Sequence, residues 1–203
     1  GVTEERVQLM KDNNVPDWYI ESCRRIKYMF PRAHAVAYVM MSYRIAWFKV
    51  YYPVPFYAAY FTTKVADFNS EVVLKGSGAI LARIDEILAK GKNATKKEED
   101  EMTVLEVAYE MYSRGYEFEP INFGVSDGTK FYEHEGKVLL PFMAVSGIGE
   151  TAAKALADEC RIKPFETIEE LKNRTRISNS NIESLKAMGV LEGMPETDQL
   201  SMF

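Results

Sequence analysis

The chain of 203 residues has little cysteine and histidine, with only two residues of each. Cys23 and Cys160 lie far apart in the sequence, and neither has a cysteine or histidine near it at the spacing of metal ligands. This argues against a disulfide framework and a zinc knuckle, and it fits a protein of the reducing cytoplasm.

Long hydrophobic runs are also missing. The longest uncharged stretch, Val50 to Thr63, is interrupted by Pro53 and Pro55 and is well short of the ~20 apolar residues that a membrane helix needs. We therefore expect no membrane contact. The chain starts at Gly1 without a methionine or a secretory leader, which we interpret as a cut or cloning boundary of a fragment.

An excess of positive charge is missing as well. The formal net charge is -5, which argues against a protein coated with basic patches. The charges are unevenly distributed, however. Residues 22–66 contain seven basic side chains, twelve aromatic ones and no acid, whereas acids concentrate in residues 98–119.

The hydrophobic spacing predicts a mainly α-helical chain with a small antiparallel β ribbon. Helices are expected after Val15-Pro16-Asp17 and from Pro31, and the second should bury an apolar stripe that runs from Val36 to Val50. Further helices are expected over 56–64, 78–90, 98–114, 150–158, 167–174 and 182–188, with capping boxes at Thr95/Glu98 and Thr167/Glu170. Residues 116–140 alternate in polarity and carry turns at 127–128 and 135–136, which predicts the ribbon.

The stretch "VSGIGETAAKAL", residues 145–156, places two glycines at the start of a predicted helix. Gly147, Gly149 and Ala152 satisfy the dinucleotide pattern G-x-G-x-x-G/A, so an oxidoreductase has to be considered. That fold needs a second parallel strand after the helix. Residues 165–174 have a helical cap and helical spacing instead, which disfavours a nucleotide cofactor.

The alternative is a helix-hairpin-helix over residues 141–190 that holds DNA without reading its sequence. Successive backbone amides and a helix N-terminus would point at a phosphate, and glycine is required because a side chain would hold the strand away. Val145 and Leu156 should then be core residues, while a plain tight turn remains the non-functional interpretation. The DNA-binding candidates are Gly147, Ile148, Gly149, Thr151 and Lys154.

At this point the chain resembles the C-terminal portion of the PolC-type replicative DNA polymerase III α subunit. The resemblance rests on "VPDWYIESCRRIKYMFPRAHAVAYVMMSYRIAWFKVYYPVPFYAAYFTTK" (15–64), "TVLEVAYEMYSRGYEF" (103–118), the glycine hairpin and the terminal "QLSMF". It implies three parts: the end of the polymerase fingers over 1–69, a duplex-binding domain over 70–195, and a flexible tail over 196–203 that carries a clamp-binding peptide.

The resemblance also implies the binding partners of the chain and the absence of catalytic carboxylates from it. The partners are double-stranded primer-template DNA, the sliding clamp (β subunit) and the rest of the polymerase chain. Catalytic carboxylates on an Asp-x-Asp segment would hold Mg²⁺ in the palm, and no Asp-x-Asp occurs here. We therefore expect no catalytic residue, no metal site and no cofactor in this chain, and no nucleotide addition by it alone.

Two further groups of site residues follow from the resemblance. Template-primer or nucleotide contacts could come from Arg32, His34, Arg44 and Lys49, although His34 could equally satisfy a helix start and Arg44 could extend from a buried helix. The clamp-binding residues would be Gln199, Leu200, Met202 and Phe203. A DNA-binding helix-hairpin-helix module of a repair or junction-processing protein remains the alternative function.

Overall fold

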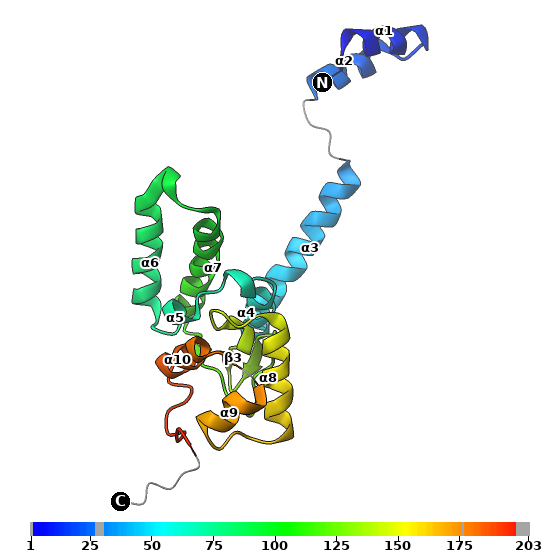
Figure 1. Cartoon of the computed structure of the whole chain (residues 1–203). Helices are drawn as coiled ribbons and strands as arrows, with labels where there is room; N and C mark the ends of the chain where they lie inside the picture. Colours follow the sequence, from blue (N-terminus) through cyan, green and yellow to red (C-terminus); the bar gives the residue numbers. More distant parts are fainter. Residues whose placement is uncertain (1, 27–30, 176, 198–203) are drawn as a thin grey trace, which may run out of the picture. The chain divides into compact units, whose positions relative to one another are not determined.

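The computed structural model describes residues 2–26, 31–175 and 177–197 (Figure 1). The four predicted clamp-binding residues (Gln199, Leu200, Met202 and Phe203) therefore lie outside the described residues. The chain divides into two compact units, residues 1–47 and 48–203.

The smaller unit begins with a pair of short helices, α1 (Glu4–Asp12) and α2 (Asp17–Arg25). Val7, Ile20 and Cys23 are buried between them. Pro16 immediately precedes α2, as predicted, because proline suits a helix start where no amide partner is available.

Helix α3 (Arg32–Tyr51) begins directly after Pro31, as predicted, but it does not bury its apolar stripe. Within the described chain none of its residues is buried, and Tyr43 is 76% exposed and Val50 64% exposed. The prediction of a buried stripe is wrong for this chain. Spacing identifies an apolar helix face, but the element that covers the face has to be present before it is buried.

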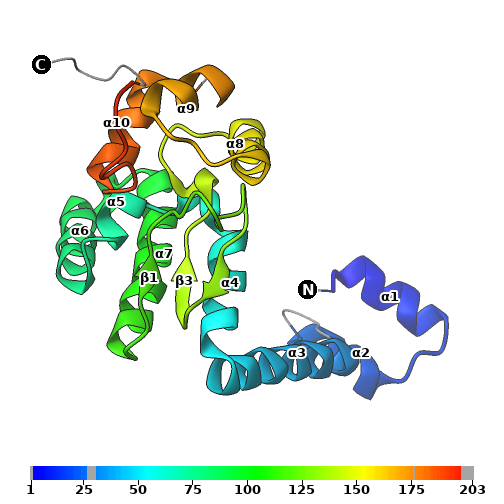
Figure 2. The same cartoon turned by 90° about the horizontal axis from the view of Figure 1, so that it is seen from below.

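The core of the larger unit forms around α4 (Pro53–Thr63) and α7 (Lys96–Ser113). Tyr57 and Phe61 of α4 are fully buried, so the compact unit begins before the expected boundary at 69/70. Around them lie η1 (Val65–Asp67), α5 (Ser70–Val73), α6 (Ser77–Lys90) and η2 (Gly91–Asn93). Helices α6 and α7 lie side by side (Figures 1 and 2), and the predicted capping box of Thr95 and Glu98 starts α7.

The sheet of the larger unit has three short strands in the order β1-β3-β2. The hairpin of β2 (Tyr132–His134) and β3 (Lys137–Leu139) is antiparallel, with its turn at Glu135 and Gly136 as predicted; both residues have positive φ, +49° and +78°. However, β1 (Phe118–Glu119) runs parallel to β3. The expectation of a wholly antiparallel ribbon needs correction here, because the long connection 120–131 lets the chain return before β2.

Two successive helical hairpins complete the unit, as expected. They comprise η3 (Phe142–Ala144), α8 (Glu150–Ile162), α9 (Ile168–Thr175) and α10 (Asn179–Ala187) (Figure 2). The predicted capping box at α9 is modified: the Glu170 amide donates to Thr167 Oγ1, but the Glu170 carboxylate accepts from the Glu166 amide instead of the Thr167 amide.

Candidate nucleic-acid interface

The loop between η3 and α8 turns its apolar residues inward and its glycines outward. Val145 and Ile148 are 2% and 5% exposed, while Gly147 and Gly149 are exposed. Gly147 has φ +84°, a conformation that L side chains rarely adopt. Together with Leu156, which is 1% exposed, Val145 belongs to the core as predicted.

The amides of this loop differ in their availability. The Ile148 amide donates to the Val145 carbonyl at 3.1 Å, so among the candidates its N–H is already used inside the turn. In contrast, no acceptor within the described chain contacts the amides of Gly147, Gly149 or the first α8 turn, residues 150–152. Gly149 is the N-cap of α8 and offers no side chain to the helix. The start of α8 therefore presents unbonded N–H groups and the positive end of the helix dipole to solvent.

The two candidate side chains on α8 are exposed, but they are not equivalent. Lys154 Nζ lies 2.6 Å from Glu150 Oε1 one turn earlier. Each partner shifts the other's pKa toward the charged form: the pKa of Lys154 is raised and that of Glu150 is lowered. Thr151 forms no side-chain hydrogen bond to any described residue. A phosphate would therefore have to compete with Glu150 for Lys154.

The position of α8 depends on a turn that the sequence did predict, at Asp127 and Gly128. A Cβ added at Gly128 would lie 2.8 Å from Lys154 Cα, so this glycine lets the turn pack directly against the α8 backbone. Its carbonyl accepts from the Met143 amide at 2.9 Å, and Asp127 pairs with Arg161 near the end of α8. The turn at 127–128 thus contacts both η3 and α8 and fixes their relative position.

Sequence analysis did not identify Asn181, which contacts the glycine loop from α10. Its side-chain Nδ2 donates to the Ser146 carbonyl at 3.1 Å, and the residue is only 8% exposed. The only signal in the sequence was Ser178, three residues earlier, which is the N-cap of α10. Nothing in that local pattern indicates a contact 35 residues away.

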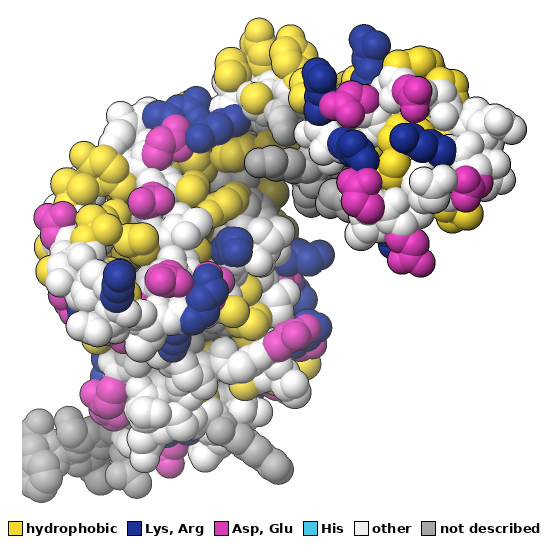
Figure 3. Space-filling model, turned by 90° about the horizontal axis from the view of Figure 1, so that it is seen from above, with side chains coloured by type: hydrophobic (Ala, Val, Ile, Leu, Met, Phe, Trp, Pro, Cys, Tyr) yellow, Lys and Arg dark blue, Asp and Glu magenta, His cyan; other side chains and the backbone are white. Residues whose placement is uncertain are grey.

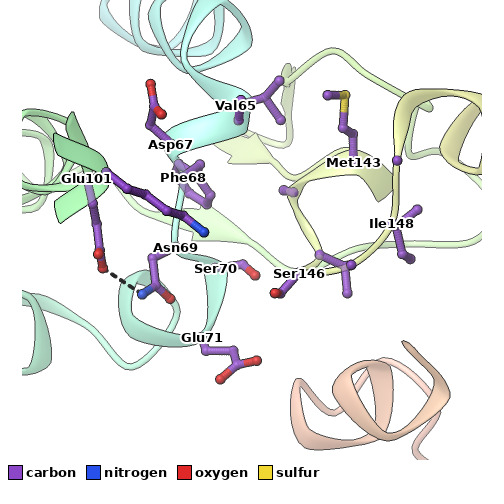
Figure 4. A pocket seen from close by; sticks show the side chains of 16 residues that line it. Val65, Asp67, Phe68, Asn69, Ser70, Glu71, Glu101, Met143, Ser146 and Ile148 are labelled. Carbon is purple, nitrogen blue, oxygen red and sulfur yellow. Dashed lines mark hydrogen bonds between the residues drawn. The ribbon is translucent and has the colours of Figure 1, made fainter. Parts of the chain in front are cut away.

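An open hollow of about 570 Å³ lies beside the loop. Figure 4 shows Asn69 and Ser70 on one side of it and Ser146 and Ile148 on the other. Gly147, Gly149 and Lys97 also line it. Lys97 is the basic residue of this lining, and no ion pair joins it to a described carboxylate. It is a second site residue that sequence analysis missed, because Lys97 and Gly147 are brought together only by the fold.

The candidate nucleotide contacts occupy different environments. Arg32, His34 and Arg44 lie on the part of α3 that belongs to the smaller unit, where His34 packs edge-on against Tyr38. Lys49 belongs to the larger unit, where its Nζ lies 3.0 Å from Glu110 Oε2.

Lys49 is part of a polar network at the end of α3. It also lies over the rings of Phe56 and Tyr57, and Tyr57 donates to Glu110 at 2.6 Å. Burial, followed by this hydrogen bond, raises the pKa of Tyr57 to about 12. The surroundings of Lys49 therefore provide a structural role for its charge.

The residues that follow α10 contact the larger unit as far as Glu196. The carbonyls of Pro195 and Glu196 accept from the Ile168 and Glu169 amides, each at 3.0 Å, and Glu196 pairs with Lys186. Met194 packs against the core. The tail that was expected to be flexible from residue 196 onward is therefore held at Glu196, because the first amides of α9 require acceptors and these carbonyls supply them.

Residues 2–26, 31–175 and 177–197 contain no group of three or more His, Cys, Asp or Glu side chains that could hold a metal ion. None of the helices in the described part of the chain has the length and hydrophobicity required to span a bilayer.

Comparisons with known proteins identify the relationship. Residues 115–200 match the family described as a helix-hairpin-helix motif. The chain is 53% identical to the "DNA polymerase III PolC-type" of Caldanaerobacter subterraneus subsp. tengcongensis, 48% to that of Clostridium perfringens and 44% to that of Bacillus subtilis. Each comparison covers 100% of the chain but only 14% of the relative's length. The resemblance found in the sequence is thus confirmed: over its full length the chain matches a segment of PolC-type DNA polymerase III.

Proposed function

We propose that this segment holds the sugar-phosphate backbone of primer-template DNA for a PolC-type DNA polymerase III. The observation that carries the proposal is the set of exposed, unbonded amides of Gly147, Gly149 and residues 150–152 at the uncapped start of α8. Several N–H groups that converge at a helix N-terminus suit a phosphate oxygen, and they require no basic side chain.

Amide contacts suit both the charge of the chain and the task of a replicative polymerase. Basic and acidic side chains are interspersed over the face of the molecule in Figure 3, so the charges on that face do not gather by sign. Backbone N–H groups attract a phosphate without a basic patch, which agrees with a net charge of -5. Phosphate contacts also carry no sequence information directly, and a replicative polymerase has to bind every sequence it copies.

Two lysines supplement the amides in this proposal. Lys97 lines the hollow beside the loop without a carboxylate partner among the described residues, and Lys154 lies one turn into α8. Three acidic side chains also line the hollow, Asp67, Glu71 and Glu101, and of these Glu101 is paired with Arg83 through two hydrogen bonds. In Figure 4 the carboxylate of Asp67 points away from Ser146. In this proposal Lys97 is the more available cation for a phosphate, because Lys154 already forms an ion pair with Glu150.

The substitution Gly149→Val tests the proposal with little effect on folding. Gly149 has φ -76° and ψ 165°, which any residue adopts, and a Cβ there would meet no atom within 4 Å. The added side chain would instead occupy the space in front of the amides. Since a hydrogen bond to a charged group contributes about 1.5–3 kcal/mol, duplex affinity should fall roughly tenfold to a hundredfold.

The matched control is Gly78→Val. Gly78 lies in α6 and likewise has no atom within 4 Å of an added Cβ. Fluorescence anisotropy with a labelled primer-template at one low salt concentration compares the variants, because salt dominates such affinities. Equal affinities of the Gly149→Val and Gly78→Val chains would contradict the phosphate contact.

The proposal extends to the sliding clamp. The peptide Gln199-Leu200-Ser201-Met202-Phe203 would insert its apolar residues into a groove of the clamp. Deletion of residues 199–203 should abolish clamp binding in surface plasmon resonance and leave duplex affinity unchanged. A truncated chain that retains full clamp affinity would refute this part.

We further propose that the segment adds no nucleotides by itself, because the Asp-x-Asp carboxylates that would hold Mg²⁺ are not in its sequence. A primer-extension assay with Mg²⁺ and all four triphosphates tests this, and extension that survives repurification would overturn it. The names of the relatives favour a polymerase over a repair or junction-processing protein, the alternative considered from the sequence.

A further inference from the structure

The side chain of Asn181 links the second helical hairpin to the glycine loop. Its Nδ2 donates to the Ser146 carbonyl at 3.1 Å, and its Oδ1 accepts from the Ser178 hydroxyl. The two ends of the amide group therefore have different partners, and this fixes the orientation of the group. Burial to 8% exposure makes both hydrogen bonds costly to lose.

Asn181 also lies close to Gly147. A Cβ at Gly147 would lie 2.8 Å from Asn181 Nδ2, so the asparagine can approach only because residue 147 is glycine. The positive φ of Gly147, +84°, independently requires glycine.

The bonded carbonyl belongs to the peptide unit whose N–H is the amide of Gly147. Because a trans peptide is planar, its C=O and N–H point in opposite directions. When the Ser146 carbonyl points at Asn181, the Gly147 N–H must point away from Asn181. This N–H has no acceptor within the described residues, and Gly147 is exposed. A donor at the carbonyl also polarises the peptide and makes its N–H a stronger donor.

We infer that Asn181 is a positioning residue for DNA binding: it sets the direction of the Gly147 N–H toward the phosphate without touching the DNA. This inference rests on the proposed function of the glycine loop. It also assigns a role to the second hairpin, which supports the first hairpin by one buried side-chain amide.

Two substitutions separate positioning from folding. Asn181→Ala removes the donor. Asn181→Asp keeps the shape of the side chain and its contact with Ser178. It also places a carboxylate in the first turn of α10, where a negative charge stabilises a helix. However, it removes the donor and sets a negative charge against the Ser146 carbonyl. Since a hydrogen bond contributes about 0.5–1.5 kcal/mol, Asn181→Ala should weaken duplex binding roughly twofold to tenfold, and Asn181→Asp at least as much.

The matched control is Ile182→Val. Ile182 is the next residue of α10 and is 1% exposed, so this substitution destabilises the same helix from its buried face. Duplex affinity of each full-length variant is measured by anisotropy, and amide hydrogen exchange is followed at Ile148, whose N–H donates to the Val145 carbonyl within the turn. Exchange at this amide should accelerate in both Asn181 variants, while affinity and exchange should stay at the wild-type level in Ile182→Val.

A double-mutant cycle with Gly149→Val tests whether Asn181 acts through the loop. If it does, Asn181→Ala should weaken binding by less than about twofold in the Gly149→Val background, because the two changes disable one site. Gly149→Val without any effect would overturn the phosphate contact and this inference with it. A loss of binding with Gly149→Val but wild-type affinity in both Asn181 variants would overturn the positioning role alone.

Discussion

Substitution of Gly128 by alanine should destabilise the larger unit and weaken DNA binding together. The added Cβ would lie 2.8 Å from Lys154 Cα, 2.9 Å from Lys154 N and 3.0 Å from Ala153 C. Carbon atoms in contact are normally about 3.5–4.0 Å apart, so the turn and α8 have to separate by roughly 1 Å. All three neighbours are backbone atoms of a helix, which cannot rotate aside as the end of a side chain can.

Overpacking of this kind typically costs about 1–3 kcal/mol of unfolding free energy. For a chain of this size each kcal/mol lowers the melting temperature by about 2–4 °C, so the expected decrease is about 2–12 °C. Duplex affinity should fall as well, because the displaced helix carries the amides of residues 150–152.

The assay is thermal unfolding by circular dichroism, with Gly78→Ala as the control. An alanine at Gly78 has open space around it in a helix, so this variant should be unchanged or stabilised by up to about 1 kcal/mol. A Gly128→Ala chain that melts within about 1 °C of the wild type would refute the close packing of the turn on α8.

Three further predictions concern titration and salt. The hydrogen bond to Glu119 raises the pKa of His134, so the stability that His134 contributes should be complete below the unfolded pKa of about 6.5 and disappear as pH rises through the folded pKa. Urea unfolding of wild type and His134→Gln at pH 5.5 to 8.5 should show this difference shrinking, and a constant difference would argue against it. Burial raises the pKa of Cys160 to about 11, so in a Cys23→Ala chain its alkylation at pH 8 should be about a hundredfold or more slower than after unfolding, and equal rates would contradict this. Because neutral amides release no counterions, the plot of log affinity against log salt should have a slope of roughly -1 to -2, from Lys97 and Lys154, and a slope near -6 would require a basic surface instead.

The sequence was sufficient for features that are encoded locally. The Thr95/Glu98 capping box, the turn at Glu135 and Gly136, and the start of α2 after Pro16 depend on a few neighbouring residues, and each forms as predicted. The glycine loop belongs to the same class, since Gly-x-Gly before a helix limits the chain to few conformations.

Features that depend on distant segments could not be predicted in this way. The apolar spacing of α3 correctly located a helix, but the spacing could not reveal that none of its residues is buried within the described chain. The parallel pairing of β1 with β3 depends on the path of residues 120–131 and not on any pattern within the strands. Lys49 illustrates the same limit: its charge predicts a contact with the template-primer or the nucleotide, but the local pattern cannot indicate that Glu110 lies 3.0 Å away in the fold.

The direction of the loop amides is itself a tertiary property, although the glycines can be recognised in sequence. Three features support this turn: its own side chains Val145 and Ile148 are buried in the core, Gly128 lets the turn at 127–128 pack against α8, and Asn181 binds the Ser146 carbonyl. A Gly-x-Gly segment without these supports would have the freedom to point its N–H groups elsewhere, and ordering it on DNA would cost conformational entropy. In the proposed phosphate contact, the rigidity of the surrounding helices should therefore add to the affinity that the exposed amides provide, because it removes that cost before the DNA arrives.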